Sequence, residues 1–322
     1  MSLELFTEML QYMRPAGSKA ERNFIKRYIK PLEVEQDAFG NLYKRVGTAP
    51  ILWSSHTDTV HITGGKQAVD IDANGWLTAP LSNCLGADCT TGVYLMREMI
   101  LAGVEGLYVF HRAEEVGGQG SAWIAKNTPQ LLEGIKFAIA FDRKDMSSII
   151  TFQFGERCCS DGFGKSLMAQ LGDGWALDDG GTFTDTANYV DLIGECTNLS
   201  VGYYDQHTRK ERQSWPFLLY LLDRLKALDV NALVQARNPG DSETLWGAMP
   251  NDFTSPKAWN TWMDDGTILF NDLRDPTRTN AKGRNHRYLV DTILDHPDAV
   301  ADMLNEYGIS SDDILAVVAG CR

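Results

Sequence analysis

Residues 107–142 read LYVFHRAEEVGGQGSAWIAKNTPQLLEGIKFAIAFD, and this stretch decides the fold class. It begins with a short apolar run, continues through a segment with the pattern of a helix, and ends with a second apolar run at 137–141. Two short buried strands joined by a helix predict a unit in which the strands are parallel. Carboxylates follow each strand, Glu114 and Glu115 after the first and Asp142 after the second. The stretch therefore predicts acidic side chains at one edge of a parallel sheet.

The same alternation of strands and helices extends to either side of this unit. We predict further strands at 51–53 and 199–204, and helices at 92–101, 121–126 and 215–228. We therefore expect an α/β fold with a mixed, mainly parallel central sheet and helices on both faces. In such sheets ligands bind outside the carboxyl ends of the strands, where His56 and His207 are expected.

The first fifty residues predict two helices and a hairpin. Apolar residues at helical spacing indicate a first helix, which Pro15 and Gly17 end. Ser18 and Glu21 have the spacing of a capping box, which begins the second helix. Alternating apolar residues on both sides of a turn within 32–46 predict the hairpin.

The pattern of the chain changes near residue 235. We expect a catalytic core over 1–235, followed over 236–322 by an irregular wrapping segment and a small helical C-terminal extension. Residues 236–284 show little periodicity and are rich in Asn, Asp, Pro, Thr and Trp, whereas a helical pattern returns from Tyr288.

Composition and charge restrict the partners and the compartment. A net charge of −13 should repel phosphate backbones and anionic lipids, so we expect neither a nucleic acid nor a membrane partner. The N-terminus lacks the basic region of a signal peptide, and no apolar stretch has the length of a membrane span. The six cysteines lack zinc-knuckle spacing. We therefore expect a cytoplasmic protein with reduced thiols.

Five short polar clusters carry the residues that could perform chemistry. They are SSHTD (54–58), LGADCTTG (85–92), AEEVGG (113–118), AFD (140–142) and YDQH (204–207). Together they supply two histidines and four carboxylates that could hold a pair of divalent metal ions. Four of the five are expected at the carboxyl ends of strands, which is where the fold would place a ligand.

A hydrolase with two metal ions needs a bridging anion, further ligands on each ion, and a separate base that accepts a proton from water. The adjacent Glu114 and Glu115 suit a division of labour, because one carboxylate can bind metal while the other acts as general base. The two could also exchange these roles. Asp58 lies two residues beyond His56 and could orient its imidazole.

The clusters resemble the motif of the co-catalytic zinc exopeptidases, the group that contains bacterial leucyl aminopeptidase, peptidase T and the carboxypeptidase and deacylase relatives. The resemblance covers residues 1–230 and implies a three-layer sandwich with two divalent ions per chain, most typically zinc. It implies these roles: His56 and Asp142 on one ion, Glu115 and His207 on the other, Asp88 as the bridge, Glu114 as general base and Asp58 as the partner of His56.

The chain departs from the family pattern at two positions. Cys89 stands where the family usually has a second aspartate, and Asp142 is followed by Arg143 and Lys144 instead of a small residue. The family also has a cis peptide after its bridging aspartate, which implies a cis bond between Asp88 and Cys89. Such a bond is costly outside proline and needs support from its surroundings.

The spacing of the last two ligands narrows the branch of the family. Residues 143–206 separate Asp142 from His207, and the lid domain of peptidase T and the deacylases would need a longer insertion. The resemblance thus implies an aminopeptidase without an inserted lid domain. We expect it to hydrolyse peptide bonds of small peptides.

Three other functions remain open. A carboxypeptidase or N-acyl amino acid deacylase would use the same metal site, with Arg143 or Lys144 binding a substrate carboxylate. A glutaminyl cyclase-like transferase would use the same fold with one working zinc ion. A non-catalytic binding protein is disfavoured, because the expected base and ligands are all present.

Three further aspartates stay open as site residues. Asp145 or Asp161 could replace Asp142 if the strand ends elsewhere. Asp185 lies in a polar segment, GTFTDTANY, and could recognise a substrate ammonium group or simply form a turn.

Overall fold

The computed structural model describes residues 2–245. Most of the predicted wrapping segment and the predicted helices from Tyr288 onward lie outside the described residues. The described residues 236–245 run along the core, where the backbone N–H groups of Ala236 and Arg237 both donate to the Glu195 carboxylate at 2.8 Å. The boundary at residue 235 stays a prediction.

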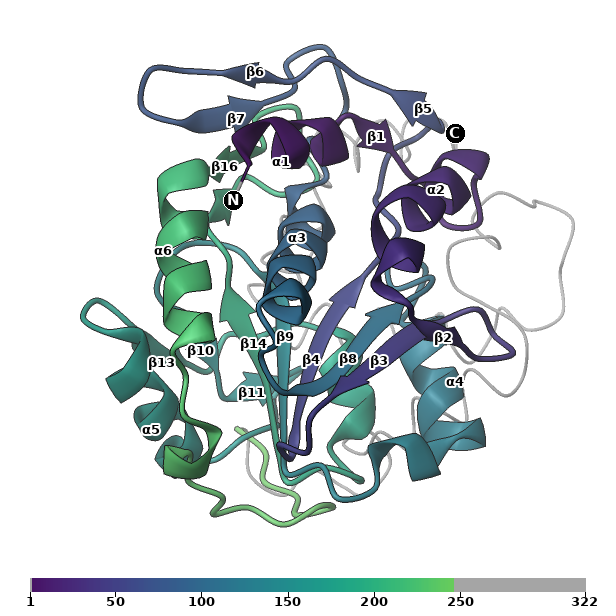
Figure 1. The fold of residues 1–322 in the computed structure, drawn as a ribbon. Coiled ribbons are helices and arrows are strands. Elements are labelled where there is room, and N and C mark those ends of the chain that lie inside the picture. The colour runs from purple at the N-terminus through teal and green to yellow at the C-terminus, as the bar shows by residue number, and fades with distance from the viewer. Residues whose placement is uncertain (1, 246–322) are drawn as a thin grey trace, which may run out of the picture. The chain divides into compact units, whose positions relative to one another are not determined.

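An eight-stranded mixed sheet forms the centre of the described part (Figure 1). Its inner strands β14, β9, β4 and β8 are mutually parallel, whereas β3 and β2 continue the sheet in antiparallel order at one edge. The mainly parallel sheet predicted from the sequence is therefore confirmed. Across the sheet the strands are β13 (Ala176–Asp178), β10 (Ser148–Ile150), β14 (Glu195–Ser200), β9 (Phe137–Arg143), β4 (Ile51–His56), β8 (Gly106–His111), β3 (Leu42–Val46) and β2 (Glu35–Gln36).

Helices cover both faces of this sheet because side chains alternate along the central strands. Ile51 and Trp53 of β4 point into one hydrophobic core, and Leu52 between them points into the other. The first core is completed by α1 (Leu3–Leu10), α2 (Lys19–Phe24), α3 (Ala87–Leu101), α5 (Asp161–Leu171) and α6 (Trp215–Lys226). The second is completed by α4 (Gln119–Asn127) and the short helices η3 (Pro129–Leu132) and η4 (Asp185–Tyr189). The predicted helices on both faces are confirmed.

Helix α3 lies against β4 and β9 with its N-terminus at the carboxyl ends of the strands. Gly92 permits this approach, because a Cβ atom there would lie 2.5 Å from Ser55 Oγ and 2.6 Å from the Phe141 carbonyl oxygen. Ser55 Oγ in turn donates to the Cys89 carbonyl oxygen at 3.1 Å. The first turn of α3 is therefore held directly over the end of β4.

The N-terminal elements agree with their prediction except at the capping box. Ser18 Oγ accepts the Glu21 backbone N–H at 3.0 Å, as expected for an N-cap. The Glu21 carboxylate, however, does not turn back to the Ser18 N–H but accepts from Gly17 N at 2.7 Å and Thr57 Oγ1 at 2.6 Å. The helix continues as a π-helical turn, η1 (Ile25–Ile29), and a 3₁₀ turn, η2 (Lys30–Leu32).

The single strand predicted at 199–204 is wrong in its extent. The chain forms β14 in the central sheet and then β15 (Tyr203–Tyr204) in a separate four-stranded sheet, because Gly202 with φ +91° turns the backbone between them. That smaller sheet has the order β15, β16 (Arg212–Ser214), β7 (Trp76–Thr78) and β6 (Asp70–Ile71). His207 thus follows a strand of the smaller sheet.

The interval between Asp142 and His207 contains no inserted lid domain, as predicted. Its residues return to the central sheet as β10, β13 and β14, with α5 packed on one face. The remaining short elements of the described chain are β1 (Tyr12–Met13) paired with β5 (Gly65–Lys66), β11 (Phe152–Gln153) paired with β12 (Glu156–Arg157), and η5 (Val230–Ala232).

None of the helices between residues 2 and 245 combines the length and the apolar character that a bilayer-spanning helix requires. The five cysteines in this range are buried and form no disulfide.

Candidate metal centre

His56 ends β4 with one ring nitrogen held and the other turned toward a carboxylate. Its Nδ1 lies 3.1 Å from the Asp58 carbonyl oxygen, which can only accept, so the bond assigns the proton to Nδ1. Nε2 is the ring nitrogen left for a metal ion, and it lies 3.5 Å from Asp142 Oδ1. Asp142 is itself held by its backbone N–H, which donates to Asn198 Oδ1 at 3.1 Å. One ion could bind between His56 and Asp142.

The Asp58 carboxylate is fully buried and supports the neighbouring acidic cluster. Its Oδ1 accepts the Glu114 backbone N–H and its Oδ2 accepts the Glu115 backbone N–H, both at 3.2 Å. The contact with His56 is made mainly by the Asp58 backbone, since the nearest carboxylate oxygen lies 3.6 Å from Nδ1. Asp58 therefore joins the His56 segment to the two glutamates.

Replacing Asp58 with alanine should expose the importance of this link. Asp58→Ala leaves two N–H groups without their acceptor, so we expect the free energy of unfolding to fall by about 3 kcal/mol. Chemical denaturation of the metal-free protein measures this directly. The matched control is Asp72→Ala. Asp72 also accepts two backbone N–H groups but lies in an exposed turn. Equal small losses in both variants would contradict the role given to Asp58.

Asp88, Glu115 and His207 come together from three separate segments. His207 Nε2 lies 2.9 Å from Asp88 Oδ2 and 3.4 Å from Glu115 Oε1, and one ligand atom from each residue lies within 4.8 Å of the others. Glu115 Oε1 is buried without a hydrogen-bond partner. A buried carboxylate oxygen without a donor is costly, and a bound cation would satisfy it.

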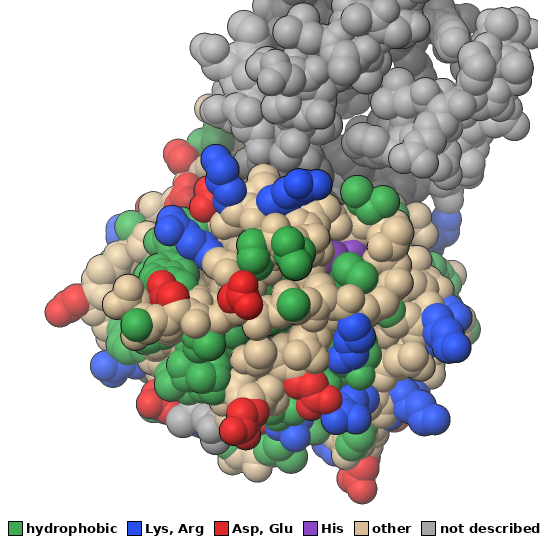
Figure 2. All heavy atoms as spheres, turned by 90° about the horizontal axis from the view of Figure 1, so that it is seen from above, with side chains coloured by type: hydrophobic (Ala, Val, Ile, Leu, Met, Phe, Trp, Pro, Cys, Tyr) green, Lys and Arg blue, Asp and Glu red, His purple; other side chains and the backbone are tan. Residues whose placement is uncertain are grey.

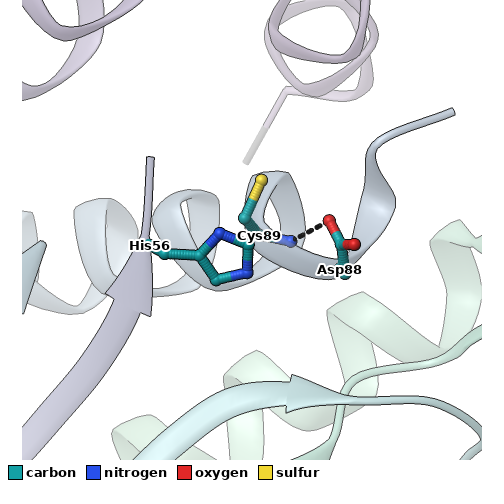
Figure 3. Close-up of side chains that lie close together, drawn as sticks. All are labelled: His56, Asp88 and Cys89. Atoms are coloured by element: carbon teal, nitrogen blue, oxygen red, sulfur yellow. Dashed lines mark hydrogen bonds between the residues drawn. The ribbon is translucent and has the colours of Figure 1, made fainter. Parts of the chain in front are cut away.

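Asp88 belongs to both halves of the cluster. It lies in the first turn of α3 beside the His56 ring (Figure 3), and ligand atoms of His56, Asp88 and Cys89 also lie within 4.8 Å of one another. The Cys89 side chain diverges from the Asp88 carboxylate, and its Sγ accepts Arg14 Nη2–H at 2.9 Å. Asp88 thus lies near both sets of ligand atoms, whereas the Cys89 thiol contacts a buried guanidinium.

The peptide bond between Asp88 and Cys89 is trans, and the cis bond implied by the family resemblance is wrong for this structure. Helix α3 begins at Ala87, so this peptide lies in the first helical turn, which requires trans geometry. The Cys89 backbone N–H donates to Asp88 Oδ1 at 2.6 Å. No cis peptide occurs anywhere in the described residues.

Glu114 lies beside the ligands without direct contact to His207. Ligand atoms of Glu114, His56 and Glu115 lie within 4.8 Å of one another. Burial raises the pKa of Glu114 well above its usual range, and the Asp142 and Glu115 carboxylates raise it further, although His56 opposes them. Glu114 is therefore close to the potential metal site and poorly solvated, which suits a residue that exchanges a proton.

The cluster holds more negative charge than its surroundings can solvate. Burial raises the pKa of Glu115 to about 7, with Asp88 adding to the effect against His207. Burial opposes the charge of His207, but the Glu115 and Asp88 carboxylates outweigh it and raise its pKa well above the usual value. Protonation of His207 therefore offsets part of this charge, and divalent cations would replace such protons.

The side chains of the cluster are mostly enclosed by the described residues. Side-chain exposure rises from 1% for His56 to 16% for His207. On the face of the described part seen in Figure 2, a histidine side chain is visible beside hydrophobic side chains. Such enclosure limits the water that competes with a bound substrate.

Strained backbone lies on both sides of the cluster. Ala113, directly before Glu114, has φ +61°, and His207 also has φ +61°. Left-handed backbone at residues other than glycine costs about 1–3 kcal/mol and collects at functional sites. The strain here turns the chain so that Glu114 and His207 face the same cluster.

The aspartates left open by the sequence do not join this cluster. Asp145 accepts hydrogen bonds from Ser147, Ser148 and Ser200, so it does not replace Asp142. Asp185 is 1% exposed and lies 3.2 Å from His111 Nδ1, so its carboxylate faces a buried histidine and not an open cleft. Asp161 likewise pairs with Arg157 at 3.0 Å on the surface.

Several buried residues that support the cluster are missed by the sequence analysis. Glu211 and Gln213 contact the first turns of α3, and Asn198 holds Asp142. None of these belongs to a motif that could be read locally. Glu211 and Gln213 lie in a polar stretch, so the sequence gives no signal that they are buried, and only the fold shows what they contact.

The comparisons with known proteins agree with this geometry at the level of fold. No protein-family model matches the sequence, and curated proteins show no similar sequence. Solved structures do match. Aminopeptidase PepT from Bacillus cereus ATCC 10987 has a TM-score of 0.58 at 15% identity, covering 71% of this chain and 97% of its own.

Two further solved structures are similar to the same extent. A tripeptidase from Staphylococcus aureus subsp. aureus Mu50 has a TM-score of 0.56 at 14% identity, covering 71% of this chain and 97% of its own. The Pyrococcus horikoshii TET1 peptidase has a TM-score of 0.54 at 16% identity, covering 70% and 98%. This chain therefore has the α/β fold of these peptidases. The match extends over nearly the full length of each solved structure.

Proposed function

We propose that this protein is a two-zinc hydrolase of peptide bonds, an aminopeptidase that acts on small peptides. The observation that carries the proposal is the position of Asp88, which lies within 4.8 Å of ligand atoms from His56 on one side and from Glu115 and His207 on the other. A shared carboxylate between two histidine-containing sets is what a pair of cations requires. The fold of solved aminopeptidases and a tripeptidase supports the proposal.

The donor set fits zinc. Two imidazole nitrogens and several carboxylate oxygens are ligands that zinc binds readily, and the orphaned Glu115 Oε1 supplies an unused acceptor. We propose the following assignment: His56 and Asp142 for one ion, Glu115 and His207 for the other, and Asp88 between them. When bound, zinc would polarise the scissile carbonyl group and acidify a water molecule.

The residues of the chain would move the proton and position the reacting groups. The Glu114 carboxylate would accept a proton from the attacking water. It would then donate this proton to the nitrogen of the departing amine. Asp58 holds the Glu114 backbone N–H at 3.2 Å and so limits where that carboxylate can swing. The buried surroundings exclude competing water.

The state of Arg143 favours an aminopeptidase over a carboxypeptidase or deacylase. The latter two need a cation for the substrate carboxylate, and Arg143 is one of the two candidates, Lys144 being the other. Its Nη2 lies 3.1 Å from Asp178 Oδ2, and the Arg143 side chain is only 12% exposed. A guanidinium already paired with a protein carboxylate is a poor receptor for a second one.

A substrate panel separates these activities. Zinc-loaded protein is incubated with dipeptides and tripeptides that have a free N-terminus, with the same peptides N-acetylated, with N-acyl amino acids, and with a glutaminyl peptide. Cleavage only of the free N-terminal residue supports the proposal. Preference for N-acyl substrates, cyclisation of the glutaminyl peptide, or binding without turnover would each overturn it in favour of a deacylase, a cyclase or a binding protein.

Zinc should also stabilise the protein. After treatment with a chelator, zinc at 100 times its dissociation constant should add about 2.7 kcal/mol to the free energy of unfolding. For a protein of this size that corresponds to a rise in melting temperature of about 4 °C. Differential scanning fluorimetry with and without zinc measures it, with magnesium as the control cation. An unchanged melting temperature, together with less than one zinc ion bound per chain, would rule out the metal centre.

A further inference from the structure

Glu211 is a buried carboxylate that none of the proposed chemistry uses. It is 1% exposed, and its two oxygens accept three consecutive backbone N–H groups, those of Leu85 at 2.9 Å, Gly86 at 3.2 Å and Ala87 at 2.7 Å. These N–H groups precede Asp88 directly. More than 120 positions separate Glu211 from these N–H groups, so the contact links two segments that are distant in the sequence.

The N-terminus of α3 depends on this carboxylate because it has no side-chain cap of its own. Its N-cap residue is Gly86, with φ +72°. A Cβ atom at this position would lie 2.8 Å from Thr59 Cγ2 and 3.1 Å from His61 Cε1, so a serine or aspartate cap does not fit. The unpaired N–H groups and the helix dipole favour a negative charge there, and Glu211 supplies it.

The same glutamate belongs to the loop that carries His207. This loop joins β15 to β16 and is closed by Glu211 N–H donating to the Thr208 carbonyl oxygen at 3.1 Å and by Thr208 Oγ1 donating to the Asp205 carbonyl oxygen at 2.7 Å. A second link lies one turn along α3, where Thr91 Oγ1 donates to Gln213 Oε1 at 2.7 Å. The helix is therefore joined to the loop through Glu211 and to the adjoining strand β16 through Gln213.

We propose that Glu211 is a positioning residue that sets the separation of Asp88 and His207 and thereby the zinc affinity of the Glu115–His207 position. The proposal rests on the proposed function, since it takes these residues as ligands. Glu211 itself touches neither substrate nor ion. It fixes the backbone one residue before Asp88 and four residues after His207, and the two ligands meet at 2.9 Å between these anchors.

Glu211→Gln tests the proposal, because the amide keeps the size but offers an NH₂ group where an acceptor is needed. Glu195→Gln is a matched control. Glu195 is also fully buried and accepts N–H groups from Ser160, Ala236 and Arg237. It lies opposite Phe137 at the amino end of the parallel strands, away from the ligands at their carboxyl ends.

Zinc affinity is measured by competition with a chromophoric chelator, and the stability of each zinc-free variant by urea denaturation. We expect both variants to lose stability, but only Glu211→Gln to lose zinc affinity, by about 10- to 100-fold for the more weakly held ion. Wild-type affinity in Glu211→Gln, or an equal loss in Glu195→Gln, would overturn the inference. If the wild-type protein binds no zinc, the proposed function fails instead.

A second variant covers the case in which Glu211→Gln does not fold. Thr91→Val keeps the shape of the side chain but removes the hydroxyl that bonds to Gln213, and so loosens the same junction. We expect a smaller, several-fold loss of zinc affinity in Thr91→Val, whereas an affinity equal to that of the wild type would count against positioning by this junction.

Discussion

Glu114→Gln should lower kcat by about 100- to 10,000-fold while the protein keeps its zinc. The amide has the size of the carboxylate but cannot accept a proton from water, so proton transfer is lost and the ligands stay in place. Steady-state hydrolysis of a free N-terminal dipeptide gives kcat, and metal analysis of the same sample gives the zinc content.

The neighbouring residue is the control for this experiment. Glu115→Gln should lose zinc, because Glu115 Oε1 lies 3.4 Å from His207 Nε2 and has no other partner. If instead Glu114→Gln lost zinc and Glu115→Gln kept it, the two roles would be exchanged. Full activity in Glu114→Gln would remove it from the mechanism.

Asp88→Asn should affect the metal centre more than any other single ligand change. Its carboxylate lies near ligand atoms of both histidines, as that of Glu115 also does, and an amide brings no negative charge between two cations. We expect the affinity for the second zinc ion to fall by more than about 100-fold, since even changes outside the ligand shell cost that much. Isothermal titration of the metal-free protein measures both binding steps.

Two variants bracket this result. Asp142→Asn removes a ligand from one proposed ion only, so one tightly bound zinc ion should remain. Cys89 lies next to Asp88, but its side chain contacts Arg14. We therefore expect both ions to remain in Cys89→Ser. Two tightly bound ions in Asp88→Asn would show that it does not bridge, and loss of an ion in Cys89→Ser would make the thiol a ligand.

Local periodicity and position along the chain predict the central part of the fold and the residues that follow its strands. The strands β4, β8 and β9 are continuous apolar runs, so they are recognised directly, and parallel pairing brings their carboxyl ends together. His56, Glu114, Glu115 and Asp142 follow these strands, and their proximity could be predicted on that basis. The helices on both faces follow from the same alternation.

Short elements whose pairing partners are distant in the sequence cannot be predicted in this way. Strand β15 has only two residues, and its partner β16 pairs with β7, which lies more than 120 positions earlier. Such short strands show no periodic pattern in the sequence, so the smaller sheet could not be predicted. The predicted strand leading into His207 was therefore wrong, although His207 itself lies in the cluster. Glu21 was similarly assigned a local cap, because its contact with Thr57 depends on tertiary packing.

The division of the ligands between two sheets gives bound zinc a second consequence, one for folding. His56 and Asp142 end strands of the central sheet, whereas His207 is carried by the smaller sheet. An occupied centre would act as a cross-link between segments far apart in the chain, and closing a long loop removes conformational entropy from the unfolded state. No disulfide forms among the described residues, so the bound metal ions would take the stabilising role that a disulfide cross-link has in other proteins.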